Sequence, residues 1–179
     1  MNEPRITPGA RHDVGLVAWA VSWVSGRVSG RGPPNLFLTV ARHRRLFFGW
    51  LHFAGRLMPG GRLPRRDTEL VILRVAHTRR CAYEIAHHAH LARRAGLDAA
   101  AVERVAGDGR DPAWSARQRT LLVAVDELLA NRDLHDDTWR DLGEFLDDRQ
   151  RIELLLLVGH YDMLATFANT LRVASDERR

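Results

Sequence analysis

The sequence predicts an all-α protein, and three observations lead to this fold class. Apolar residues recur at intervals of three and four through most of the chain, which is typical of helices with one buried face. No segment keeps the period-two alternation of a half-buried strand. Helix-stop signals such as Pro59-Gly60-Gly61 and Gly96 follow the periodic segments. The 179 residues suit one domain, or one domain with an extra segment.

The first predicted element is a short helix over residues 14–24. This apolar run is too short to span a bilayer, which needs ~20 residues. No clear small-x-small cleavage site follows it, which argues against a signal peptide. Residues 25–34 contain three glycines and two prolines, so we expect a linker there. These features predict an N-terminal extension over residues 1–34, ahead of a helical domain over residues 35–175.

The helical domain is predicted to begin with a long helix over residues 35–58, with Asn35 as its N-cap. A helix over residues 67–77 follows, with Asp67 as its N-cap, and we expect a break at residues 78–80. The remaining helices are expected at residues 81–95, 98–105, 115–130, 136–146 and 149–173. The leucine run in the last helix predicts burial on nearly all its sides.

The charge and the cysteine content of the chain indicate which binding partners and which cellular compartment to expect. The net charge is +5 and every basic residue other than histidine is arginine. The arginines are spread along the chain beside acids, as in Arg65-Arg66-Asp67, so we expect no nucleic-acid partner. Since no transmembrane helix is visible in the sequence, we also expect no membrane partner. The single cysteine, Cys81, excludes an intrachain disulfide and fits a reducing cytoplasm.

Three chemically capable residues fall on one face of the helix predicted near residue 81. Cys81, Glu84 and His88 have the spacing i, i+3, i+7. A thiol at a helix N-terminus is more acidic than a free thiol, so we expect Cys81 to favour the thiolate. Glu69 lies on the preceding helix and could face this group. We interpret these four residues as a catalytic cluster, because histidine and a carboxylate can exchange protons near neutral pH.

Each of these residues also has a structural interpretation. Glu84 could be the N3 glutamate of a capping box. Glu69 could pair with Arg65 or Arg66 one turn back. A metal site can be imagined from the histidines, Cys81 and Glu84, but the spacing matches no ligand pattern. We therefore predict neither a metal nor a cofactor.

The stretch over residues 63–97 resembles the core of the carboxymuconolactone decarboxylase and alkyl hydroperoxidase D-like family, and the likeness extends back to residue 35 and forward into the last helix. The resemblance implies an alkyl hydroperoxidase D-like helical bundle with a central helical hairpin. It also implies a homo-oligomer, as a dimer, trimer or hexamer. The redox branch has Glu, eleven residues, Cys, two residues, Cys, three residues and His. Here these positions are Glu69, Cys81, Glu84 and His88, so Glu84 replaces the second, peroxidatic cysteine.

This replacement leaves three functions open. The first is a cofactor-independent acid–base enzyme of the decarboxylase, lyase or isomerase type on a small organic acid or lactone. Its catalytic residues would be Glu69, Glu84 and His88, with Tyr83 and His87 binding substrate. The second is a single-cysteine hydroperoxide reductase of peroxiredoxin type that uses Cys81. The third is a nonenzymatic binding or assembly module on the same scaffold.

Overall fold

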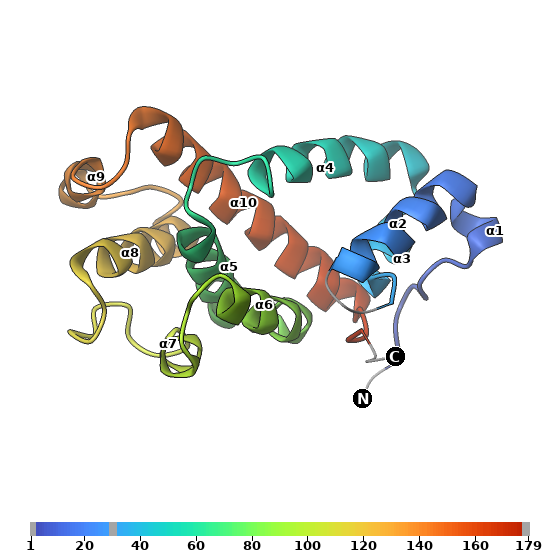
Figure 1. Cartoon of the computed structure of the whole chain (residues 1–179), viewed down its shortest axis with the longest axis horizontal. Helices are drawn as coiled ribbons and strands as arrows, with labels where there is room; N and C mark the ends of the chain where they lie inside the picture. Colours follow the sequence, from blue (N-terminus) through green and yellow to red (C-terminus); the bar gives the residue numbers. More distant parts are fainter. Residues whose placement is uncertain (1–2, 29–31, 177–179) are drawn as a thin grey trace. The chain divides into compact units, whose positions relative to one another are not determined.

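The computed structural model describes residues 3–28 and 32–176, and it contains ten α-helices and no strand within those ranges (Figure 1). The all-α prediction is therefore confirmed. The chain forms two compact units, one from residues 1–60 and 166–179 and the other from residues 61–165. The predicted domain boundary at residue 35 stays a prediction.

The first unit holds α1 (Arg11–Val14), α2 (Leu16–Val28), α3 (Asn35–Val40) and α4 (Arg44–Leu57). Its core joins α1, α2, the C-terminal end of α3 and α4 through four buried residues: Val14, Ala18, Ala41 and Phe47. Phe37 adds edge-to-face contacts to Phe47 and Trp50, with ring centroids 6.1 and 4.9 Å apart. Aromatic packing therefore holds α3 against α4.

Several predicted boundaries in this unit are wrong. The helix expected to end at residue 24 continues to Val28, into the predicted linker, of which residues 29–31 lie outside the described residues. The single helix expected over residues 35–58 is broken at residues 41–43, where His43 Nδ1 accepts a hydrogen bond from Leu46 N and begins α4. Asn35 is not an N-cap but lies in the first turn of α3, after Pro34.

The second unit is built around the hairpin of α5 (Arg65–Thr78) and α6 (Ala82–Arg94), with α8 (Ala116–Asn131) packed against α5. α7 (Ala99–Arg104), α9 (Asp136–Gly143) and the larger part of α10 (Asp148–Leu171) complete it. α5 is buried on most of its circumference, including the charged residues Asp67 and Glu69. Asp67 is not an N-cap, because α5 begins two residues earlier and Arg117 pairs with its carboxylate at 2.7 Å.

The predicted break at residues 78–80 is confirmed and forms the turn of the hairpin. Arg80 adopts a positive φ of 50°, and Cys81 N donates to Ala76 O at 2.8 Å to close the end of α5. Arg79 reaches away from this turn to Asp162 of α10, at 2.6 Å, and to the carbonyl of Leu129. The turn is thus attached to two other helices.

α10 is the one described helix that is long and apolar enough to cross a membrane by length and composition alone. Core helices of soluble proteins meet the same criterion. The sequence predicted that its leucine run is buried on nearly all sides, and this prediction is wrong. Leu154 and Leu157 are buried, whereas Leu155 and Leu156 are exposed. The run therefore has one buried apolar side and one exposed apolar side.

Candidate active site

The structure brings Glu69, Glu84 and His88 together inside the α5–α6 hairpin. His88 Nδ1 lies 2.8 Å from Glu69 Oε2, and His88 Nε2 lies 3.3 Å from Glu84 Oε2. Each nitrogen of the imidazole therefore faces a carboxylate. Glu69 is fully buried, and Glu84 and His88 are only 3% and 4% exposed. The helical spacing predicted the Glu84–His88 contact, and the hairpin supplies Glu69.

The charges in this cluster alternate. Arg65, one turn before Glu69 on α5, places its guanidinium 2.6 Å from Glu69 Oε1. Glu69 therefore has both partners that the sequence offered it, an arginine one turn back and His88. The resulting order is Arg65, Glu69, His88 and Glu84, in which each charge lies beside an opposite one. Opposite neighbours make burial of these charges tolerable.

His88 is held as an imidazolium by its two carboxylate partners. Burial lowers the pKa of His88, but the hydrogen bonds and charges of Glu69 and Glu84 outweigh burial and raise the pKa to about 9. Only the protonated ring donates from both nitrogens, which matches the two contacts. At neutral pH the ring is therefore positively charged.

Glu84 is the member of the cluster with spare bonding capacity. Its Oε2 faces His88, while its buried Oε1 has no hydrogen-bond partner among the described residues. The capping-box interpretation does not hold, because no side chain caps α6 and the Cys81 N–H donates to Ala76 O. A buried carboxylate oxygen without a hydrogen-bond partner destabilises the folded state, and it is available for proton transfer.

Cys81 is the N-cap residue of α6, which begins where the sequence predicted a helix start, but the expectation of a thiolate is wrong. Burial raises the pKa of the Cys81 thiol to about 11, and the charge of Glu84 adds to this. The backbone N–H groups of Glu84 and Tyr83 lower the pKa but do not compensate for burial. Arg79 does not help, because its guanidinium pairs with Asp162. The thiol is therefore neutral at physiological pH.

Tyr83 and His87, the predicted substrate-binding residues, lie next to the cluster on α6. Their rings are stacked, with centroids 6.3 Å apart and planes 4° from parallel. The His87 ring also meets the His88 ring edge-on, at 5.2 Å. Tyr83 is buried and His87 is half-buried. Whether either residue contacts a substrate stays a prediction.

Two residues of α10 belong to this neighbourhood and were not predicted as site residues. The ring of Tyr161 packs perpendicular to that of His88, with centroids 5.2 Å apart. Burial lowers the pKa of His160 to about 4, although the charge of Glu84 opposes this. The sequence marked the last helix as part of the site only through the family resemblance. Nothing in its spacing shows that it packs on residues some seventy positions earlier.

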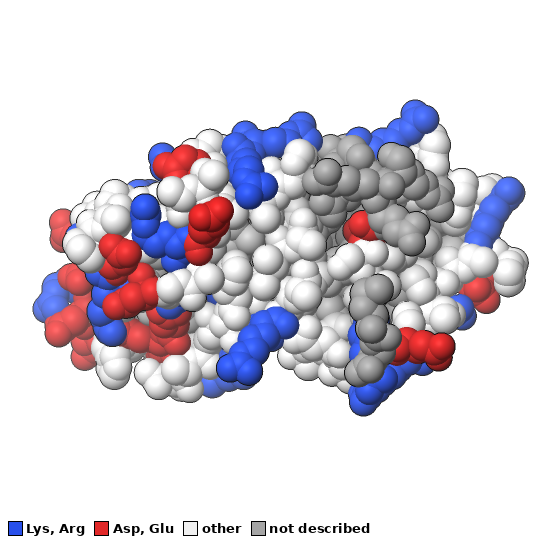
Figure 2. Space-filling model, turned by 90° about the horizontal axis from the view of Figure 1, so that it is seen from below, with Lys and Arg blue, Asp and Glu red and all other residues white. Residues whose placement is uncertain are grey.

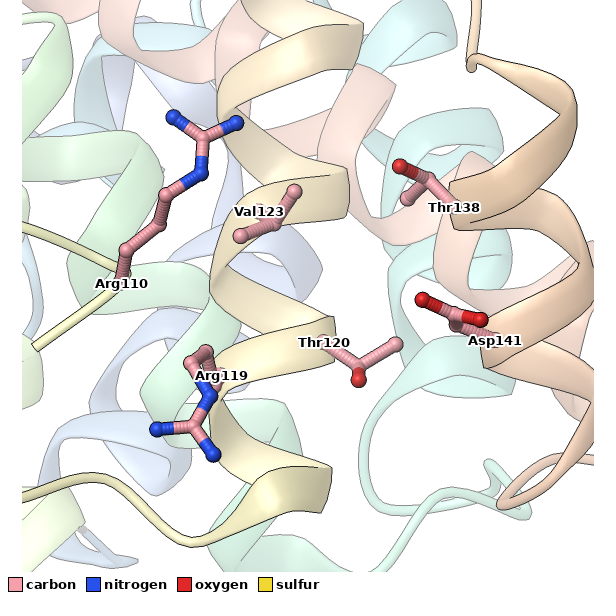
Figure 3. A pocket seen from close by; sticks show the side chains of 6 residues that line it. All are labelled: Arg110, Arg119, Thr120, Val123, Thr138 and Asp141. Carbon is pink, nitrogen blue, oxygen red and sulfur yellow. The ribbon is translucent and has the colours of Figure 1, made fainter. Parts of the chain in front are cut away.

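A cavity of about 290 Å³ lies elsewhere in the second unit. Figure 3 shows Arg110 and Arg119 on one side of α8 and Thr138 and Asp141 of α9 on the other. Its lining contains none of the predicted site residues and is formed by Arg110, Arg119, Thr120, Val123, Thr138 and Asp141. This cavity is therefore separate from the carboxylate–imidazolium cluster.

The fold and the cluster define a helical protein with a buried carboxylate–imidazolium cluster in a central hairpin. Residues 45–127 match the model of the carboxymuconolactone decarboxylase family, which supports the resemblance seen in the sequence. No protein of curated function matches the sequence.

Solved structures with the same fold span nearly the whole chain. A peroxidase-related protein from Ralstonia eutropha JMP134, described as having an alkylhydroperoxidase AhpD core, aligns with a TM-score of 0.83 and 17% identity over 98% of this chain and 95% of its own. A peroxidase-related protein from Silicibacter sp. TM1040 aligns with a TM-score of 0.82 and 16% identity, over 97% of this chain and 94% of its own. The debrominase Bmp8 was solved as a cysteine-to-alanine variant with 2,3,4-tribromopyrrole. It aligns with a TM-score of 0.80 and 14% identity, over 99% of this chain and 94% of its own. At these identities the likeness establishes the fold.

Proposed function

We propose that this chain is a cofactor-independent acid–base enzyme acting on a small organic acid or lactone. The observation that carries the proposal is the buried Oε1 of Glu84, which has no hydrogen-bond partner among the described residues, on a carboxylate whose other oxygen faces the His88 imidazolium. A carboxyl group in this position can take a proton from the ring at one oxygen and give it to a substrate from the other.

The chemistry follows from these positions. In a decarboxylation, the bond to the leaving carboxylate breaks and its electron pair moves toward the lactone carbonyl oxygen. The His88 imidazolium supplies the positive charge that stabilises the enolate. The proton that Glu84 relays from His88 then forms the new C–H bond, and water restores the proton to the ring. Glu69 and Arg65 hold the ring in place.

The burial of the cluster restricts the substrate. Glu84 and His88 are almost inaccessible, so a substrate reaches Oε1 only if neighbouring side chains move. A small and flat molecule needs the least movement. Cys81 then serves as a neutral wall of the site, in agreement with its raised pKa.

The test compares two reactions on the purified chain. With 4-carboxymuconolactone we expect release of carbon dioxide and loss of ultraviolet absorbance, both abolished by Glu84→Gln and unaffected by Cys81→Ser. Cumene hydroperoxide with dithiothreitol tests the thiol alternative in the same preparations. Decarboxylation that survives Glu84→Gln unchanged would contradict the proposal.

A second candidate, the single-cysteine hydroperoxide reductase, has one observation in its favour. The backbone N–H groups of Tyr83 and Glu84 both bond to the Cys81 thiol and would stabilise a thiolate once it formed. In this reaction the thiolate attacks the peroxide O–O bond, giving an alcohol and a sulfenic acid that two external thiols reduce. Hydroperoxide turnover lost in Cys81→Ser would support this candidate. No turnover of either substrate would support the nonenzymatic module, which the near-complete burial of the cluster favours.

A further inference from the structure

The arginines are unevenly mixed with acids, which corrects the expectation that the two lie side by side along the whole chain. Residues 14–60 contain no aspartate or glutamate, and they contain six arginines: Arg27, Arg31, Arg42, Arg44, Arg45 and Arg56. From residue 67 onward, acids and arginines are interspersed along the sequence. Figure 2 shows the same mixture on the surface, with red and blue side chains interleaved in the region of α8 and α9. The first unit is therefore the basic part of the molecule.

The outward face of α4 combines this positive charge with bulky apolar side chains. Arg45, His52 and Arg56 lie one and two helical turns apart along the exposed side. Leu46, Phe48 and Phe53 border them and are 62%, 42% and 38% exposed. We call these six residues the basic–aromatic face. The opposite side of α4 is buried in the core of the first unit through Phe47.

The charges on this face are uncompensated. α4 contains no acid, and Arg44, Arg45 and Arg56 form no ion pair with any described residue. Gly49 and Gly55 have open space where a Cβ would be, so the helix surface between the large side chains is accessible. Exposed apolar side chains beside unpaired arginines mark an interaction surface.

We propose that the basic–aromatic face docks the chain, peripherally, on the surface of an anionic phospholipid membrane. Arginines on the face attract acidic headgroups, and the exposed leucine and phenylalanines insert at the boundary between headgroups and acyl chains. The side of α4 that packs in the protein core stays there, so only the outward face meets the headgroup region and the helix does not cross the bilayer.

Two other partners fit this face less well. Nucleic acid would pair with the arginines but would leave the aliphatic side chains, Leu46 above all, in contact with water or phosphate. A second copy packed through the same face would set arginine against arginine, with no carboxylate on α4 to pair with them. An anionic bilayer satisfies both the charge and the apolar side chains.

The test is cosedimentation of the full chain with lipid vesicles. We expect binding to vesicles of phosphatidylcholine with 30% phosphatidylserine, little binding to pure phosphatidylcholine, and a steep loss of binding between 50 and 500 mM NaCl. Arg45→Glu/Arg56→Glu should weaken binding by at least about 30-fold, from about one kcal/mol per basic residue near the surface. Phe48→Ser/Phe53→Ser should weaken binding at both salt concentrations.

The matched control is Arg110→Glu/Arg149→Glu, which changes the net charge equally at two exposed sites in the second unit. It should reduce binding far less than the α4 charge reversal. Equal losses in the two charge-reversal variants would mean that net charge alone binds, and would overturn the proposal. So would binding of a 30-base-pair duplex DNA without vesicle binding. A concentration-dependent dimer, abolished by Arg45→Glu/Arg56→Glu in a chain that does not bind vesicles, would also overturn it.

Discussion

His88 has a carboxylate at each ring nitrogen, and this arrangement determines its protonation state. A histidine with one carboxylate partner can remain neutral and accept at its other nitrogen. With Glu69 and Glu84 on opposite sides, only the imidazolium satisfies both contacts. The ring is therefore a fixed positive charge at neutral pH. Under the proposed function, Glu84 Oε1, which has no hydrogen-bond partner among the described residues, is the atom that meets a substrate.

The first prediction concerns the titration of His88. In spectra of the chain labelled with ¹⁵N-histidine, we expect the ring assigned through His88→Gln to titrate near pH 9. Glu84→Gln should lower the pKa of His88, because it removes one of the two negative charges that raise it. Glu144→Gln, an exposed substitution on the same unit, is the control and should leave it unchanged. A wild-type His88 that titrates at or below pH 6.5 contradicts the cluster.

The second prediction concerns the reactivity of Cys81. At pH 8 a thiol with a pKa of about 11 has about 100-fold less thiolate than one with a pKa of 9.0, and burial slows access further. Alkylation of the native chain by iodoacetamide should therefore be at least about 100-fold slower than alkylation of the urea-unfolded chain. Mass spectrometry at timed intervals measures both rates. Comparable rates would favour the hydroperoxide reductase instead.

At the scale of elements, the α5–α6 hairpin assembles the site. Glu69 and His88 are nineteen positions apart, and the turn at Arg80 and Cys81 brings them within 2.8 Å. Periodicity predicted that both helices exist, because their apolar faces are long and regular. It did not predict the break between α3 and α4 or the start of α5. Those depend on a side-chain cap at His43 and on burial of Asp67 beside Arg117.

The third prediction tests the attachment of the hairpin turn. Arg79→Ala removes the ion pair to the mostly buried Asp162 and the hydrogen bond to Leu129 O. We expect a loss of stability on the order of 1–2 kcal/mol, measured by urea unfolding. The control is Arg140→Ala, which breaks an exposed pair with Asp137 and should cost less than about 0.5 kcal/mol. Equal effects would show that the turn is not attached through Arg79.

At the scale of the whole molecule, two buried histidines of opposite behaviour shape the stability of the chain. The pKa of His88 is raised on folding, so its contribution is complete below pH 6.5 and is lost as the pH rises through about 9. The pKa of His160 is lowered, so its contribution is present above pH 6.5 and is lost as the pH falls through about 4. The two contributions are both largely present only near pH 6.5.

The fourth prediction follows from these opposite signs. The free energy of unfolding should be greatest near pH 6.5 and fall by on the order of 3 kcal/mol toward pH 4 and toward pH 9. Urea unfolding at pH 4, 6.5 and 9 measures the curve. His160→Gln should flatten the acid side and leave the alkaline side unchanged. A stability that stays constant between pH 6.5 and 9 would contradict the raised pKa of His88.

The sequence by itself determined the fold class and the contact between Glu84 and His88, because helical periodicity and the i, i+4 spacing of these residues are local properties of the chain. The hairpin that adds Glu69 was expected only from the family resemblance. Only the tertiary structure decided the protonation of Cys81 and His88 and the part played by Tyr161 and His160. Those depend on desolvation and on charges from other helices, and neither is encoded in the spacing of neighbouring residues. The basic character of the first unit needed both sources. The sequence shows that residues 14–60 contain no acid, but only the exposure of the side chains of α4 shows that its arginines and phenylalanines share one surface.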